Sequence, residues 1–180
     1  TLQRGAVQNF GNAAAPKDLT VSLTGNATIT DSTVVLNNAA NTPMISTGQV
    51  LTMTGATTAT LNNASLNLTS FNTALVDLQG TSSLTLTGGL TLNLGSDLVF
   101  DSLSQTIDLF TLGTGTSFTE PADWDSLLTL TQDGHRLVWD GVTFNDGSLT
   151  FTGLAVPEPG TATLGLLGLA SLLMRRKRRA

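Results

Sequence analysis

The sequence of 180 residues contains no cysteine, no tyrosine and a single histidine, His135. Without cysteine, the chain has no disulfide framework, no thiolate metal site and no nucleophilic thiol. Charged residues make up 12% of the chain and aromatic residues 5%, so few side chains are available for acid–base chemistry. The stretch from residue 1 to residue 96 carries only these charged side chains: Arg4, Lys17, Asp18, Asp31 and Asp77.

Positive charge is also scarce outside the C-terminus. The formal net charge is −5, from 8 basic and 13 acidic residues, but five of the basic residues lie together at positions 175–179. The remaining chain has three basic residues against 13 acidic ones, which is a net charge of −10. A body of this charge is not suited to nucleic acid, and it fits a cell surface or an extracellular matrix.

Threonine and glycine are abundant instead, with 31 and 18 residues. Similar units recur along the first half, namely "VSLTG" (Val21–Gly25), "LTMTG" (Leu51–Gly55) and "LTLTG" (Leu84–Gly88). "NTPMISTG" from Asn41 resembles "NTALVDLQG" from Asn72, and a looser, closer-spaced match joins "VLNNA" from Val35 to "TLNNA" from Thr60. Apolar and polar residues alternate within the units, which is the period of a β-strand.

A period of about 30–33 residues with short alternating strands predicts an all-β fold, specifically a parallel β-solenoid (β-helix) over residues 1–95. Leucine, valine, isoleucine and methionine would stack inward, and threonine and asparagine would face outward. A β-sandwich is the alternative, because short alternating strands with glycine turns also build one.

The composition changes at about residue 96. Seven of the nine aromatic residues and nine of the thirteen acidic ones lie in residues 97–151. Three Asp-Gly pairs, which begin at Asp133, Asp140 and Asp146, separate alternating segments and predict hairpin turns. We therefore expect an antiparallel β-meander over residues 96–153, which caps the open edge of the solenoid and packs around four aromatic residues: Trp124, Trp139, Phe144 and Phe151.

Residues 154–180 form a third region. "VPEP" removes two backbone donors and favours an extended chain. Residues 161–174 carry no charge, and as a helix they would rise about 21 Å, short of a hydrocarbon core of about 30 Å. A basic block follows and would keep the C-terminus on the cytoplasmic side: Arg175, Arg176, Lys177, Arg178 and Arg179.

This tail resembles the PEP-CTERM sorting signal. Pro157, Glu158 and Pro159 match the motif of that family, and Arg175 to Arg179 match its basic membrane stop. The resemblance implies an exported protein of a Gram-negative bacterium, anchored transiently in the inner membrane through residues 161–174. It also implies cleavage by a membrane-embedded protease, exosortase. The body is similar in style to the passenger solenoids of autotransporters.

Candidate catalytic residues are few. His135 follows an Asp-Gly turn, and we interpret it as a strand residue. A glycosidase needs two carboxylates at a defined separation, and the nearest pairs are Asp97 with Asp101 and Asp123 with Asp125, both of which fit strand ends or turns. No motif points to a metal or a cofactor, so the sequence predicts that the protein is not an enzyme.

The sequence predicts a non-catalytic structural or adhesive protein of the cell surface or extracellular matrix. Its partners would be the processing protease, the inner membrane and exopolysaccharide or other glycans. The alternatives are a carbohydrate-active enzyme or the C-terminal fragment of a larger surface protein. The chain starts without methionine and without an apolar signal-peptide core, which favours a fragment.

Overall fold

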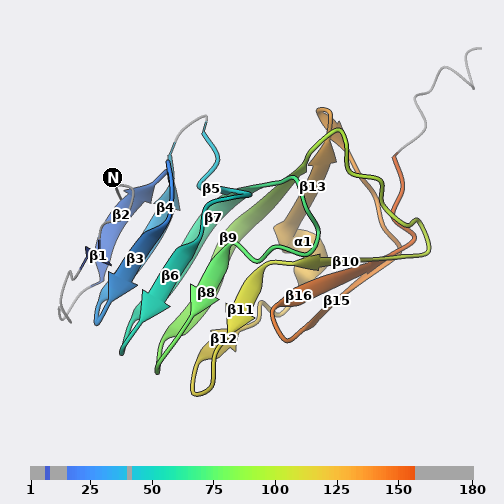
Figure 1. The fold of residues 1–180 in the computed structure, drawn as a ribbon. Coiled ribbons are helices and arrows are strands. Elements are labelled where there is room, and N and C mark those ends of the chain that lie inside the picture. The colour runs from blue at the N-terminus through green and yellow to red at the C-terminus, as the bar shows by residue number, and fades with distance from the viewer. Residues whose placement is uncertain (1–6, 9–15, 40–41, 157–180) are drawn as a thin grey trace, which may run out of the picture.

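The computed structural model describes residues 7–8, 16–39 and 42–156. These residues form an all-β fold, which confirms the all-β part of the predicted fold class. The predicted C-terminal helix over residues 161–174 lies outside the described residues. Figure 1 shows two layers of strands that run the length of the body, with a smaller sheet at the end away from β1 and β2.

The first layer is a five-stranded sheet in which all neighbours are parallel. Its strands, in spatial order, are β1 (Val7–Gln8), β3 (Ala27–Thr30), β6 (Leu51–Thr54), β8 (Val76–Leu78) and β11 (Phe110–Leu112).

The second layer is an eight-stranded sheet, parallel except for one hairpin at its end. Its strands are β2 (Lys17–Val21), β4 (Thr33–Asn38), β5 (Ile45–Ser46), β7 (Thr58–Leu68), β9 (Ser83–Leu94), β12 (Ser117–Thr119), β13 (Leu128–Gln132) and β14 (His135–Arg136).

The third sheet is antiparallel and small. It contains β10 (Ser104–Asp108), β16 (Ser148–Thr152) and β15 (Gly141–Asn145) in that spatial order, and a single helical turn, α1 (Trp124–Leu127), precedes β13.

Alternating side chains place the core between the two layers. Ile29 and Met53 from the five-stranded sheet and Leu36, Leu61 and Leu86 from the eight-stranded sheet are all buried in one apolar cluster. The residues between them along each strand point outward and are threonine, serine or asparagine at most positions. The predicted inward and outward alternation is therefore confirmed, and burial of the apolar residues holds the two layers together.

The spacing of the stacked strands differs from the predicted period. Thr33 pairs with Thr58 and Thr58 with Ser83, both at a shorter step than predicted, and the next partner, Ser117, follows after a longer one. "LTLTG" lies in the eight-stranded sheet and "VSLTG" begins at the last residue of a strand of that sheet, whereas "LTMTG" lies in the five-stranded one. The predicted period is therefore wrong, because it compares strands of different sheets, and the looser match of "VLNNA" with "TLNNA" reflects the pairing.

One corner is repeated where the chain crosses from the five-stranded to the eight-stranded sheet. The first residue of the corner has a positive φ, between 44° and 88°. Residues other than glycine rarely adopt this backbone conformation. A hydroxyl residue follows one or two positions later and donates to a backbone carbonyl of the same turn, over 2.6–2.8 Å. The four corners are Asp31 with Ser32, Gly55 with Thr57, Gly80 with Ser82, and Gly115 with Thr116.

These corners account for the buried polar residues of the described chain, Ser32, Thr57 and Ser82. Asp31 also connects successive corners, since its Oδ1 accepts the backbone N–H of Ala56 at 3.0 Å. Because each hydroxyl has an internal partner, its burial carries no desolvation penalty from an unmade hydrogen bond.

The C-terminal part follows the predicted meander only in part. β10, β14, β15 and β16 pair antiparallel, but β11, β12 and β13 pair parallel with upstream strands and extend the two layers. The segment "QTIDLFTL" (residues 105–112) is interrupted at Leu109, where the chain passes from the small sheet into the five-stranded one. The meander prediction failed here because strand patterns do not reveal the partner of a strand.

Two of the three predicted Asp-Gly turns are hairpins. Asp133-Gly134 joins β13 to β14 and Asp146-Gly147 joins β15 to β16, with positive φ at all four residues. The prediction at Asp140-Gly141 is wrong, because Gly141 begins β15 and pairs with Thr152. The aromatic residues form a cluster of Phe110, Phe118, Trp124 and Phe144, and a separate edge-to-face pair of Trp139 and Phe151 with centroids 5.4 Å apart.

Candidate functional site

The outward side of the eight-stranded sheet carries columns of uncharged polar side chains, which we call the polar face. The register places one residue of each strand beside the equivalent residue of the next, about 4.8 Å away. The columns are Thr33–Thr58–Ser83–Ser117, Thr60–Thr85–Thr119, Asn37–Asn62–Thr87, Ser65–Thr91–Thr129 and Ser46–Asn67–Asn93–Thr131.

Side-chain hydrogen bonds run along three of these columns, and in the first of them Ser83 Oγ donates to Thr58 Oγ1 at 3.3 Å. Asn62 Nδ2 donates to Asn37 Oδ1 at 2.9 Å. Asn93 Nδ2 donates to Asn67 Oδ1 at 2.9 Å, and Asn93 Oδ1 accepts from the hydroxyl of Thr131 at 2.7 Å. These bonds fix the orientation of the amides, so the polar face presents donors and acceptors in fixed positions.

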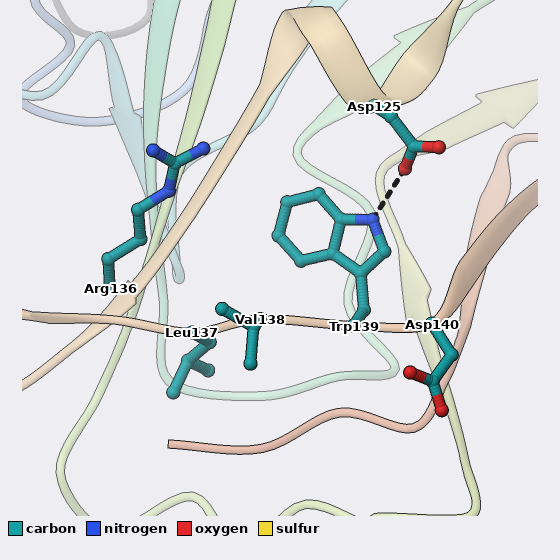
Figure 2. Close-up of a pocket in the computed structure, with 6 residues that line it drawn as sticks. All are labelled: Asp125, Arg136, Leu137, Val138, Trp139 and Asp140. Atoms are coloured by element: carbon teal, nitrogen blue, oxygen red, sulfur yellow. Dashed lines mark hydrogen bonds between the residues drawn. The ribbon is translucent and has the colours of Figure 1, made fainter. Parts of the chain in front are cut away.

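A second candidate lies at the end of the body, where a hollow of about 350 Å³ opens beside the indole of Trp139. Figure 2 shows Asp125 of α1 on one side of the ring and Arg136 of β14 on the other, with Val138 and Asp140 beside it along the chain. The indole Nε1–H donates to Asp125 Oδ1 at 2.6 Å. The ring edge also meets Phe151, so this tryptophan is held in one orientation.

The local sequence explains this geometry. Asp123 is the N-cap of α1 and accepts the backbone N–H groups of Asp125 and Ser126 at 3.0 and 3.4 Å. The cap fixes the turn and directs the Asp125 carboxylate toward Trp139. Sequence reasoning noticed Trp139 only as a packing residue, and nothing in the sequence places it next to Asp125.

Three of the four carboxylates considered for catalysis accept hydrogen bonds with structural roles. Asp101 Oδ1 accepts the backbone N–H of Leu103 at 2.8 Å in the loop between β9 and β10, and Asp97 is exposed in the same loop. Asp123 caps α1 and Asp125 bonds Trp139. His135 is exposed in β14, opposite Gln132.

The part of the chain that the structure describes contains no group of three or more His, Asp or Glu side chains placed to hold a metal ion. In that same part, no helix has the length and apolar character needed to span a bilayer.

The predicted sorting residues Pro157, Glu158 and Pro159 and the basic block at 175–179 lie outside the described residues. The structure does place the point from which they leave the body. Ala155 and Val138 exchange two backbone hydrogen bonds of 2.9 Å, and Leu154 is buried. The body is therefore fixed up to Ala155, directly before the segment that carries the motif.

Comparison with known proteins bears on this segment alone. No curated protein and no solved structure matches the chain significantly. Residues 155–179 match the PEP-CTERM protein-sorting motif, a range that includes Pro157, Glu158, Pro159 and the basic block. The matched signal implies an exported protein that is sorted by exosortase through a membrane-associated C-terminal segment.

Proposed function

We propose that this exported protein is a non-catalytic structural or adhesive component of the cell surface or extracellular matrix, and that its polar face binds exopolysaccharide or other glycan chains. The observation that carries the proposal is the set of uncharged hydroxyl and amide columns on the polar face. Such groups exchange hydrogen bonds with sugar hydroxyls, and each bond adds only about 1 kcal/mol. Binding therefore requires many contacts in parallel, which a long regular face and a long chain provide.

We also propose that the two parallel layers are successive faces of a solenoid. Support comes from the order of the chain, which visits the five-stranded and then the eight-stranded sheet in the pairs β3–β4, β6–β7 and β8–β9. The repeated corner lies between the two members of each pair. In this view residues 96–153 complete and cap the stack, and the small antiparallel sheet covers its last coil.

The hollow at Trp139 provides a second contact for a glycan. An indole ring beside carboxylate and guanidinium groups combines an apolar surface with hydrogen-bonding partners, as sugar rings require. Asp125 already accepts the indole N–H, which supports a positioning role rather than acid–base catalysis.

The processing step follows from the sorting signal. We propose that residues 161–174 hold the protein transiently in the inner membrane with the C-terminus cytoplasmic, and that cleavage near Pro157–Pro159 releases the body to the surface. Intact mass of the protein recovered from native cell surfaces tests this proposal. Loss of roughly the last 20 residues supports it, and a full-length chain retained in the inner membrane contradicts it.

Retention of the protein on polysaccharide from the native matrix tests the polar face. Replacing Thr58, Thr60 and Thr85 with valine removes three hydroxyls while keeping shape and β propensity. A matched control replaces Thr28, Thr52 and Thr54, which point outward from the other sheet. Weaker retention of the first variant alone supports the proposal. Equal retention of both variants contradicts it, and release of reducing sugar ends would favour the enzyme alternative.

A further inference from the structure

Large exposed apolar side chains gather at the end of the body from which the sorting segment leaves. In the described residues these side chains are Val99, Leu103, Val138 and Val156, with exposed fractions of 90%, 81%, 48% and 45%. We call them the exit patch. The rest of the described chain buries its large apolar residues or covers them partly, so this exposure is confined to one region.

Strand pairing places members of the patch near one another. Ser104 pairs with Thr152, so Leu103 lies next to the end of β16. Val138 pairs with Ala155, whose neighbour is Val156. Figure 1 shows the loop between β9 and β10 at the same end as the C-terminal part of β16, away from β1 and β2.

The loop that carries Val99 and Leu103 is held by hydrogen bonds. Gln132 Nε2 donates to the carbonyl oxygens of Gly95 and Leu98 at 2.9 and 2.7 Å. At the other end of the loop, Asp101 Oδ1 accepts the N–H of Leu103, and Gln105 Oε1 accepts the N–H of Asp101. The apolar side chains are thus held outward by a structured loop, although their exposure to water is unfavourable.

The length of chain beyond Val156 indicates what covers the patch. Only residues 157–160 separate Val156 from the uncharged segment 161–174, and five peptide units span at most about 18 Å. As a helix, a fourteen-residue segment is shorter than the hydrocarbon core, so its ends are drawn toward the core. While that segment is in the membrane, the exit patch has to lie close to the bilayer surface.

We propose that the exit patch rests on the lipid bilayer before cleavage, with Val99 and Leu103 inserted into the interfacial region. The contact is apolar rather than electrostatic, because Asp97 and Asp101 in the same loop give no attraction to anionic headgroups. It orients the body on the membrane and holds the segment at 157–160 near the membrane plane. This inference rests on the membrane-associated sorting signal and not on glycan binding.

The test uses the full chain inserted into vesicles of phosphatidylethanolamine with a minority of phosphatidylglycerol. Because the protein has no cysteine, Ser102→Cys gives one labelling site in the exposed loop for an environment-sensitive dye. Thr58→Cys, exposed at the start of β7, is the matched control. We expect a lipid-borne quencher to reduce the signal at position 102 at least about threefold more than at position 58.

Adding Val99→Ser and Leu103→Ser to the Ser102→Cys chain should return quenching to the level of the control. Circular dichroism of the variants checks that these exposed changes leave the fold intact. Equal quenching at positions 102 and 58 in the starting chains overturns the proposal. A blue shift at position 102 without lipid quenching also overturns it, because the apolar segment 161–174 would then be covering the patch.

Discussion

Asn93 and Asn67 face each other in adjacent parallel strands, and Nδ2 of Asn93 donates to Oδ1 of Asn67 over 2.9 Å. The same amide donates to Ser65 and accepts from Thr131, so one side chain joins β7, β9 and β13. Replacing Asn93 with alanine should lower the free energy of unfolding by about 2 kcal/mol, since several part-buried hydrogen bonds are lost. Urea unfolding measures the change.

The control for this change is Asn145→Ala, at an exposed position of β15. It should alter stability by less than about 0.5 kcal/mol. If Asn93→Ala lowers the free energy of unfolding no more than Asn145→Ala does, the amide column contributes nothing to stability.

The buried corner hydroxyls should be sensitive to removal. Thr57 Oγ1 donates to the Thr54 carbonyl at 2.6 Å and is fully buried. Thr57→Val keeps the shape but removes this bond and leaves the Thr54 carbonyl only the longer bond from the N–H of Asp31, at 3.3 Å, so we expect a loss of about 1–3 kcal/mol. Thr119→Val, at an exposed strand position, is the control. Thermal unfolding compares the two, and unchanged stability of Thr57→Val would contradict a role for the hydroxyl.

Gly48 and Gly147 have almost the same φ, so alanine substitutions at the two positions distinguish the cost of backbone strain from the cost of steric overlap. Gly48 has φ of 89° and Gly147 has φ of 90°. A Cβ at Gly48 would meet no atom within 4 Å, whereas one at Gly147 would overlap the carbonyl oxygen of Phe110. Gly48→Ala should cost about 1 kcal/mol from strain alone. Gly147→Ala should cost at least about 2 kcal/mol more because of the overlap.

Chemical unfolding of both variants gives these values directly. The carbonyl of Gly147 also accepts the N–H groups of Leu109 and Phe110, at 3.0 Å each, so this hairpin supports the bend between β10 and β11. Similar losses at Gly48 and Gly147 would mean that the turn relaxes to admit the methyl group.

The sorting motif makes a prediction in cells. Replacing Pro157, Glu158 and Pro159 together with alanine should abolish cleavage and leave the full-length protein in the inner membrane. Changing Asn145 to alanine, at an exposed position outside the matched residues 155–179, is the control and should be processed normally. Mass spectrometry of the membrane and surface fractions distinguishes these outcomes, and normal processing of the triple variant would remove the assigned role of the motif.

The sequence contained enough information for the all-β class and the inward alternation, because both follow from a local period of two along each strand. It also contained the sorting segment, whose prolines, apolar stretch and basic block are contiguous. The spacing of the paired strands was present in "VLNNA" and "TLNNA" but was outweighed by similar units in different sheets. The corners offer a better signal, since Ser32, Thr57 and Ser82 follow one another at equal steps along the chain.

The site at Trp139 could not be predicted in the same way. Its contact with Asp125 depends on how α1 docks against the chain that follows β14, and that is a tertiary relationship. The prediction of a hairpin turn at Asp140-Gly141 failed for a related reason. The pair has the composition of a hairpin turn, but strand pairing of Gly141 with Thr152 determines its conformation.

The position of β16 has a mechanical consequence. It is the central strand of the small sheet, hydrogen-bonded to β10 on one side and β15 on the other, and it is the last strand before the segment that leads to the membrane. A pull on that segment first loads the two bonds between Ala155 and Val138 and then both edges of β16 together. The attachment point therefore resists peeling, and a force applied through the tail is carried by the small sheet before it reaches the stacked layers.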